Sequence, residues 1–117
     1  MGNSEFNFIG NYQLLTDYFG YFPNFHDDEM TDIQLMRDGC NLKVTISSFQ
    51  NKDKKTTIVL LFEKICNLLI EDFNHQNVIF NLEIIKEQDE YISVNFESSF
   101  GASIRLKCKH INVQSLK

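Results

Sequence analysis

Hydrophobic and polar residues alternate along most of this 117-residue chain, with the period of two that is typical of strands half buried in a β-sheet. Residues 11–20 differ, because their hydrophobic side chains recur one, three and four positions apart: Leu14, Leu15, Tyr18 and Phe19. This spacing predicts a short amphipathic helix. Gly20 is the residue type that commonly ends a helix, so we expect the helix to stop there.

Residues 30–49 predict a β-hairpin. The pair Asp38-Gly39 is a turn signal, and it separates two alternating runs of hydrophobic residues: Ile33 and Leu35 before it, and Leu42, Val44 and Ile46 after it. Upstream of the hairpin, Pro23 favours an extended turn, and Phe22 and Phe25 are expected to fill the space beneath that loop.

Further strands are predicted by β-branched residues and by alternation. The hydrophobic run from Thr56 predicts a strand to Phe62, while residues 65–70 are left open as a second short element. Alternation predicts strands at 78–85, 92–96 and 102–108, the last extended past a bend by residues 111–113. We therefore expect a single domain over residues 1–117 of the α+β class, with one short N-terminal helix packed on a mostly antiparallel sheet of about six strands.

Composition and charge narrow the choice of partners. Hydrophobic residues make up 43% of the chain and charged residues 23%, which is the balance of a globular domain. Eleven Lys and Arg stand against 16 Asp and Glu, for a formal net charge of −5. This charge argues against nucleic acid or an anionic membrane as a partner and favours a basic protein.

The expected location is the cytoplasm. The first ten residues, MGNSEFNFIG, lack the cationic start and apolar stretch of a secretion signal, and the chain has no run of about 18 apolar residues that could span a membrane. The three cysteines, Cys40, Cys66 and Cys108, are odd in number and widely spaced, so we expect free thiols in a reducing compartment.

The densest group of chemically active side chains is His26-Asp27-Asp28-Glu29. One imidazole and three carboxylates in sequence invite a metal site. In an extended chain, however, successive side chains point to opposite faces, so His26 and Asp28 would share one side and the other two carboxylates would share the other. Neither pair is a full ligand set unless His75 or His110 completes it. The alternative is structural, with the ring of His26 bonded to a backbone carbonyl or a nearby carboxylate.

A second polar group, residues 72–77, combines Asp72, Asn74, His75 and Asn77 around Phe73. Turn chemistry explains most of it, because Asp and Asn cap turns and tolerate the left-handed backbone conformation. The remaining interpretation is directional hydrogen bonding with a partner. A broader acidic surface that attracts a cationic protein would draw on both groups and on other carboxylates, with Asp28 and Glu29 facing solvent: Asp28, Glu29, Asp32, Glu71, Asp72, Glu87, Asp89 and Glu90.

Signals of catalysis are weak in this sequence. The five glycines are isolated and form no phosphate-binding loop, and Ser98-Ser99 lacks the flanking glycines of a nucleophile elbow. Cys66 and Cys108 lie within hydrophobic or alternating runs. We therefore expect neither enzymatic activity nor a cofactor.

From about Tyr12 to Val113 the chain carries, in this order, the segments YFGYFPNFHDDEM, LLFE, FNHQNVIFNLEI and ESSFGASIRLKCKHINV. In their order and spacing these segments resemble the immunity protein 50 family of bacterial polymorphic toxin systems. The chain departs from the family pattern at Phe22 and Asp28, where that pattern has Trp and Ala. The residues that carry the resemblance are Phe19, Gly20, Pro23, Phe25, His26, Asp27, Glu29, Phe62, Asn77, Val78, Ile79, Gly101 and Cys108.

The resemblance implies a cytoplasmic antitoxin that binds and neutralises a cognate toxin, which we expect to be basic. It implies no catalytic residue. Our first hypothesis is an immunity protein that occludes its toxin with an acidic, amide-rich face, anchored by aromatic side chains such as Tyr21, Phe22 and Tyr91. The residues assigned to this face are His26, Asp27, Asp28, Glu29, Asp72, Asn74, His75 and Asn77.

Two other hypotheses remain open on the sequence. The first is a small metal- or ligand-binding module centred on His26-Asp27-Asp28-Glu29. The second is a structural domain that forms a homodimer, with an exposed sheet edge pairing with a second copy of the chain.

Overall fold

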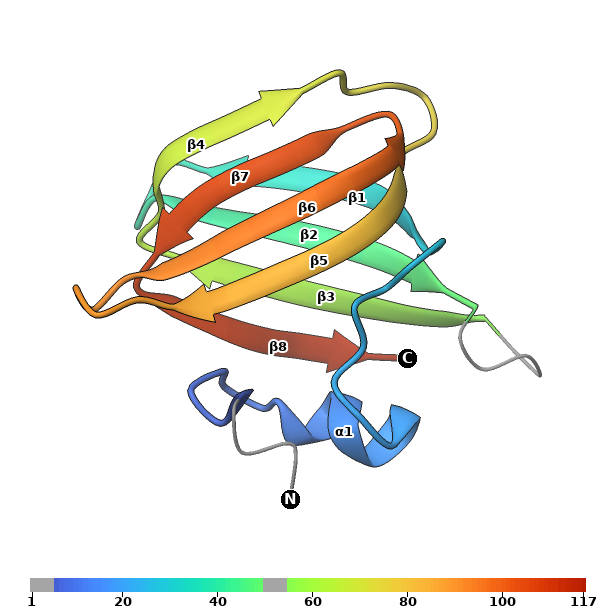
Figure 1. The fold of residues 1–117 in the computed structure, drawn as a ribbon, viewed down its shortest axis with the longest axis horizontal. Helices are drawn as coiled ribbons and strands as arrows, with labels where there is room; N and C mark the ends of the chain where they lie inside the picture. The colour runs from blue at the N-terminus through green and yellow to red at the C-terminus, as the bar shows by residue number, and fades with distance from the viewer. Residues whose placement is uncertain (1–5, 50–54) are drawn as a thin grey trace.

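The computed structural model describes residues 6–49 and 55–117, and it shows one short helix and eight strands within them (Figure 1). In chain order the elements are α1 (Gln13–Phe19), β1 (Glu29–Met36), β2 (Asn41–Ser48), β3 (Thr56–Glu63), β4 (Cys66–Glu71), β5 (Val78–Lys86), β6 (Ile92–Phe100), β7 (Ser103–Cys108) and β8 (His110–Leu116).

The strands form two facing layers. All paired strands are antiparallel, in the order β4-β7-β6-β5-β1-β2-β3-β8. The middle of this order is its weakest link, because β5 and β1 share a single register pair, Glu29 with Val78. The sheet therefore folds over at that point, with β4, β7, β6 and β5 in front of β1, β2, β3 and β8 (Figure 1).

The core fills the space between the two layers. Burial alternates strictly along β3, which confirms the strand expected from Thr56 to Phe62. Phe62 of β3 and Phe96 of β6 are fully buried and meet edge to face, with ring centroids 6.0 Å apart. Such contacts between large rings join the layers and exclude water from between them.

The expectation of about six strands is wrong, because two segments form strands of their own. Residues 65–70 were left open by the sequence, and all but the first of them belong to β4 (Cys66–Glu71), which lies at one edge of the sheet beside β7. Residues 110–116 do not extend β7. They form β8, which crosses to the other layer and pairs with β3. The N–H of Lys109 donates to the carbonyl of Glu63 (3.0 Å) at the point where the chain changes layers.

The predicted helix is confirmed as α1, which packs beside β8. Leu15 is fully buried, and the hydroxyl of Tyr18 lies 2.8 Å from that of Thr56 on β3. Gly20 ends the helix as expected, with φ of 86° and its N–H bonded to the carbonyl of Thr16. Within the described residues, no helix combines the length and the apolar content that a membrane span requires.

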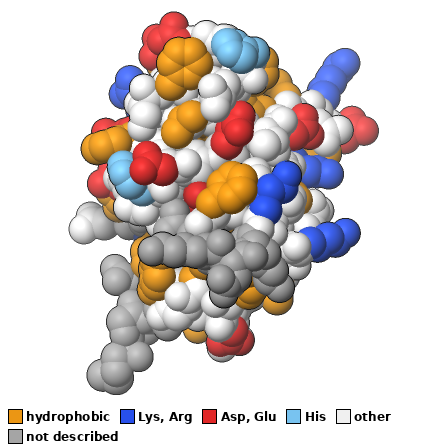
Figure 2. All heavy atoms as spheres, turned by 90° about the vertical axis from the view of Figure 1, so that its right-hand side faces the viewer, with side chains coloured by type: hydrophobic (Ala, Val, Ile, Leu, Met, Phe, Trp, Pro, Cys, Tyr) orange, Lys and Arg blue, Asp and Glu red, His pale blue; other side chains and the backbone are white. Residues whose placement is uncertain are grey.

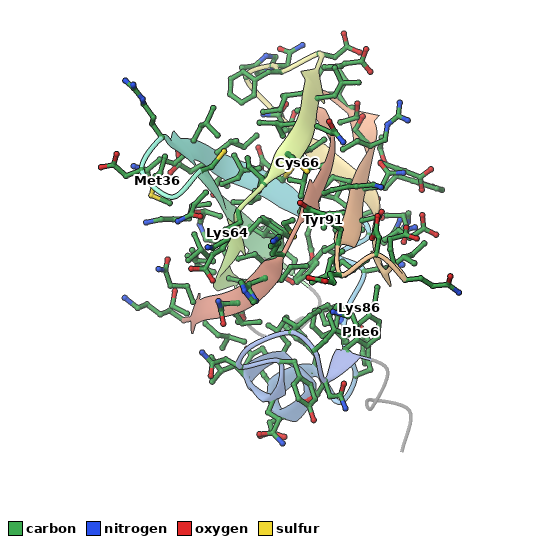
Figure 3. The ribbon with its side chains drawn as sticks, turned by 90° about the vertical axis from the view of Figure 1, so that its left-hand side faces the viewer. Phe6, Met36, Lys64, Cys66, Lys86 and Tyr91 are labelled. Carbon is green, nitrogen blue, oxygen red and sulfur yellow. The ribbon has the colours of Figure 1, made fainter. Side chains whose placement is uncertain are left out.

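The connections between strands gather at the two ends of the sandwich. The loop end, on the right of Figure 1 and facing the viewer in Figure 2, carries residues 23–28, 72–77 and 100–102. The turn end, which faces the viewer in Figure 3, carries residues 37–40, 64–65, 87–91 and 109.

Cys108 lies in the core, and its burial predicts how stability depends on pH. Loss of solvation, aided by nearby Cys66, raises the pKa of Cys108 from 9.0 to about 12. In the unfolded chain the thiol ionises near its ordinary pKa, so the unfolded state holds fewer protons between these two values. The buried thiol of Cys108 therefore makes its full contribution to the free energy of unfolding below about pH 9, and this contribution is lost as the pH rises toward 12.

We expect the difference in unfolding free energy between wild type and Cys108→Ala to shrink between pH 8 and pH 10.5, because only the wild type loses this contribution. Urea denaturation at several pH values measures the difference. Cys40→Ala is the matched control, since Cys40 is exposed, and its pH profile should parallel the wild type. If the pH profile of Cys108→Ala also paralleled that of the wild type, the raised pKa of Cys108 would be contradicted.

Candidate functional site

The loop end brings together the two polar segments that the sequence singled out. The N–H of Asp27 donates to the carbonyl of Ile79, the N–H of Ile79 donates to the carbonyl of Asp28, and the N–H of Met30 donates to the carbonyl of Asn77, each at 2.8 Å. These bonds tie residues 23–28 to the start of β5. The two segments that carry the predicted binding residues therefore lie next to each other at this end.

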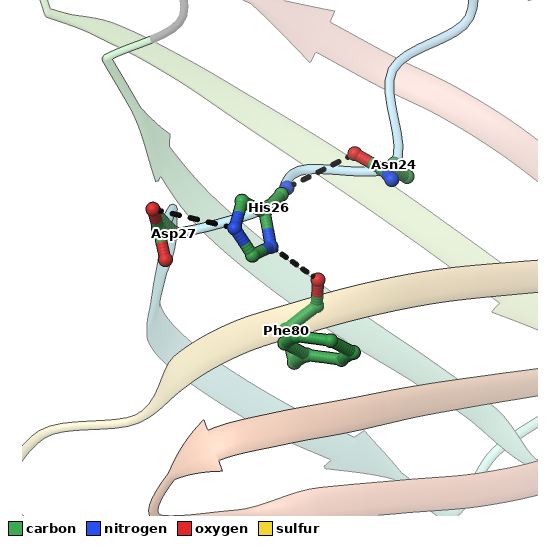
Figure 4. Close-up of polar contacts among 4 residues, drawn as sticks. All are labelled: Asn24, His26, Asp27 and Phe80. Carbon is green, nitrogen blue, oxygen red and sulfur yellow. Dashed lines mark hydrogen bonds and ion pairs between the residues drawn. The ribbon is translucent and has the colours of Figure 1, made fainter.

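His26 is held by β5 (Figure 4). Its Nδ1 lies 2.7 Å from the carbonyl oxygen of Phe80, and its ring meets that of Phe80 edge to face at 5.3 Å. Because a carbonyl oxygen only accepts, Nδ1 is the donor. Nε2 lies 3.4 Å from Oδ2 of Asp27, and this contact is an ion pair when Nε2 also carries a proton. The structural alternative stated for His26 is thus confirmed.

A buried ring beneath the loop sets the direction of these side chains. Phe25 is fully buried, as expected for a plug under the turn after Pro23. Phe25 and Asp27 both have positive φ, 60° and 68°. Such values are costly for residues other than Gly and persist where the surroundings impose them. The result is a tight reversal that leaves His26 and Asp27 exposed on its outer side.

Asp28 does not face solvent, and the expectation that it would is wrong. It is 2% exposed, and its Oδ1 accepts a hydrogen bond from the N–H of Phe49 at 3.0 Å. The period of two does not hold here, because the chain reverses at Asp27 before β1 begins at Glu29. Asp28 therefore holds the loop from inside, and Glu29 is partly exposed at the start of the strand.

Asn77 has a similar internal role. It is 4% exposed, and its Oδ1 accepts from the N–H of Asn74 (3.1 Å) and of Ala102 (2.8 Å). Its Nδ2 donates to the carbonyl of Asn74 at 3.0 Å. Gly101 has φ of 84°, and a Cβ there would collide with Asn77 and with the carbonyl of Gln76. The 72–77 loop and the 100–102 turn are thus locked together through one amide.

Three exposed phenylalanines lie among these polar groups, and the sequence interpretation missed them as a set. Phe73 in the loop is 66% exposed, Phe80 on β5 is 53% exposed, and Phe100 at the end of β6 is 48% exposed. The ring of His75 meets that of Phe100 edge to face at 6.2 Å. Figure 2 shows hydrophobic, histidine and carboxylate side chains side by side on this face. We call Phe73, Phe80 and Phe100 the aromatic cluster.

Bulges explain why alternation did not identify Phe80 as exposed. The pairing of β5 with β6 shifts register at Val78/Ile79 and again at Ile79/Asn81. The first shift leaves Ser99 of β6 unpaired, and the second leaves Phe80 of β5 unpaired. The second shift therefore reverses the side of the sheet to which the following side chains of β5 point. Ile79 and Leu82 are therefore buried, while Phe80 between them points to solvent.

The other predicted surface residues are divided between the two ends. Glu71, Asp72 and Asp27 are exposed at the loop end, whereas the 87–90 group lies in the turn between β5 and β6 at the opposite end. One acidic surface from all of them is therefore not formed. Of the proposed anchors, Tyr91 also lies at the turn end (Figure 3), and Phe22 stacks on Phe6 with ring centroids 4.5 Å apart. Tyr21 is exposed.

Comparison with protein families decides where this chain belongs. The model of one family, described as Immunity protein 50, matches residues 11–117. The chain belongs to the immunity protein 50 family. The resemblance inferred from the sequence is thereby confirmed. None of the curated proteins compared with the chain matches it.

One solved structure shares the fold of this immunity protein 50 family member. It is the crystal structure of an uncharacterized protein from Neisseria gonorrhoeae, with a TM-score of 0.57 and 17% sequence identity, over 78% of this chain and 93% of that chain. At this identity the likeness is evidence of a common fold alone.

The metal hypothesis finds no ligand set in residues 6–49 and 55–117. No three His, Cys, Asp or Glu side chains among them are grouped so that they could hold an ion. His110 begins β8 at the turn end, opposite His26. His75 directs its Nδ1 to Oδ1 of Asn74 at 2.7 Å. Of the two histidines proposed to complete the metal site, His110 is therefore distant from His26 and His75 is bonded within a turn.

Asn77→Ala is expected to lower the free energy of unfolding of this family member by about 2–3 kcal/mol, because it leaves the buried N–H of Ala102 without an acceptor. Urea denaturation checks the value. Gln76→Ala is the matched control, since Gln76 is the adjacent, exposed amide, and a change within about 0.5 kcal/mol is expected. Equal losses in the two variants would show that the Asn77 amide does not hold the loops.

Proposed function

We propose that this immunity protein binds and neutralises a cognate toxin of a bacterial polymorphic toxin system in the cytoplasm, by covering the toxin with its loop end. Membership of the immunity protein 50 family supports a toxin as the partner. The choice of surface rests on one observation, the exposed aromatic cluster set among polar groups on two loops that are bonded together. The protein acts by binding and performs no reaction on the toxin.

The aromatic cluster has the composition of a binding hot spot. A few large side chains that become buried at the centre of an interface commonly supply most of its binding energy, and polar neighbours keep water away from them. Phe73, Phe80 and Phe100 are about half exposed or more, so each has apolar surface to bury. His26 and His75 lie against two of these rings and offer polar contacts around them.

The loop end is also preorganised for binding, because its loops are already held in place in the free protein. Asp28 and Asn77 hold the loops from within, and β5 holds the ring of His26. Residues that are already ordered lose little conformational entropy on association. A rigid surface of this kind favours a partner of matching shape and tight binding, on the nanomolar scale that we expect.

Charge favours a basic toxin. The chain has a net charge of −5, and Asp27, Glu71 and Asp72 are exposed carboxylates at the loop end. Carboxylates around an interface attract a cationic partner over several ångströms and speed its docking.

The aromatic cluster is tested with the toxin domain encoded next to this chain. Phe73→Ala and Phe80→Ala should each weaken binding about 30-fold, measured by calorimetry, and reduce protection of cells that express the toxin domain. Leu35→Ala is the matched control, because Leu35 is 60% exposed on β1 away from the loop end, and it should bind as the wild type does. If both Phe variants bound with full affinity, the interface would not be at the aromatic cluster. If the wild type did not bind, this toxin domain would not be its partner.

The steering role of the carboxylates predicts a salt effect on the association rate. Raising the salt from 50 to 500 mM should slow association about tenfold or more while changing dissociation little, as measured by stopped flow. Asp27→Asn combined with Asp72→Asn should reduce both the rate at low salt and its dependence on salt. Glu87→Gln at the turn end is the control, with the wild-type rate expected. An association rate that does not depend on salt would contradict steering.

A further inference from the structure

A recess at the turn end has a chemistry unlike that of the loop-end surface. Its volume is about 490 Å³, and it opens where β3 passes to β4, β5 ends, and β7 passes to β8. Three lysines and a histidine line it in a protein that is acidic as a whole. We call it the lysine hollow, and its lining residues are Phe8, Lys64, Lys86, Glu90, Ile92, Lys109 and His110.

The residues that line the lysine hollow carry more positive than negative charge, with three lysines against one carboxylate. Glu90 is the one carboxylate among the lining residues. Glu63 and Glu87 directly precede or follow two of the lysines in sequence and do not line the hollow. Glu63 accepts from Nδ2 of Asn112 (2.8 Å) and Glu87 from the hydroxyl of Ser93 (2.7 Å), and both bonds leave the carboxylates charged. Within the described residues, no ion pair involves the lysines of the hollow.

Aromatic rings position two of the ammonium groups. Nζ of Lys86 lies 5.9 Å from the ring centroid of Phe8, and Nζ of Lys109 lies 5.6 Å from that of Tyr91. A ring face attracts a cation without neutralising its charge. Lys64 lies between β3 and β4, Lys86 ends β5, and Tyr91 lies in the turn that follows β5; all three are on the end that faces the viewer in Figure 3. The fold thus gathers cations from distant parts of the sequence and keeps their charge available.

We propose that the lysine hollow binds a multiply charged phosphate group, of the kind carried by a nucleoside diphosphate or by inorganic pyrophosphate. Each ammonium donates up to three hydrogen bonds as a compact charge, which suits a group with many acceptor oxygens. The volume exceeds what one phosphate requires, and Phe8, which is half-buried, supplies apolar surface beside the charges. The site lies at the opposite end from the proposed toxin-binding surface and does not depend on it.

Binding should also stabilise the fold. Like charges held together in the free protein repel one another, and an anion that binds only the folded state removes this repulsion and adds its own binding free energy. The melting temperature should therefore rise with the concentration of the anion.

The test is calorimetric and thermal titration of the whole chain at pH 7.5 and low salt, with pyrophosphate, ADP and citrate as separate probes. We expect pyrophosphate and ADP to bind and raise the melting temperature, and citrate, whose charges are carboxylates, to bind at least tenfold more weakly. Tighter binding of ADP than of pyrophosphate would identify a nucleotide as the source, and equal binding would identify the inorganic anion. Absence of binding, or citrate binding as tight as pyrophosphate, would overturn the proposal.

Variants locate the site. Lys64→Gln combined with Lys109→Gln should weaken pyrophosphate binding tenfold or more, while the melting temperature without anion stays the same or rises, because repulsion is relieved. This second readout separates loss of the site from loss of the fold. The matched control is Lys43→Gln combined with Lys55→Gln, which changes the net charge equally at two lysines that do not line the hollow. Equal affinity in the two double variants would overturn the assignment to the lysine hollow.

Discussion

The structure depends on a short backbone ladder between residues 27–30 and 77–79. Three hydrogen bonds of 2.8 Å and the register pair of Glu29 with Val78 link the two layers there. Elsewhere β1 and β5 diverge, which lets the sheet fold over and enclose a core. The same ladder places His26 beside Phe80, 54 residues further along the chain. One set of main-chain bonds thus closes the sandwich and assembles its candidate binding surface.

Buried polar side chains make that surface rigid. A buried carboxylate or amide is costly unless its hydrogen bonds are satisfied, and Asp28 and Asn77 are both bonded to backbone N–H groups of neighbouring segments. Because those bonds form only in one loop arrangement, they exclude others. The fixed conformation of these loops also fixes the positions of the exposed groups above them, including the aromatic cluster. Two residues that the sequence assigned to contact with a partner thus act from beneath the surface.

The two ends of the sandwich differ in their charged residues because each strand places the residues before and after it at opposite ends of the molecule. Residues close in sequence, such as Asp72 and Lys86 at the two sides of β5, are separated by the length of that strand. The aromatic cluster lies at the loop end with Asp27, Glu71 and Asp72, and the turn end carries the lysines of the hollow together with the carboxylates of residues 87–90. The net charge of −5 alone therefore does not show that the protein has two surfaces suited to different partners.

Local patterns determined much of this protein. The helix ending at Gly20, the hairpin around Asp38-Gly39 and the two polar segments were predictable, because each depends on residues close together in the chain. The family was predictable from the order of segments along nearly the whole chain. The tertiary structure decided the rest. Alternation cannot show that residues 110–116 cross to the other layer, since both layers bury every second residue in the same way. Nor can it show that bulges turn Phe80 outward, because register depends on the partner strand.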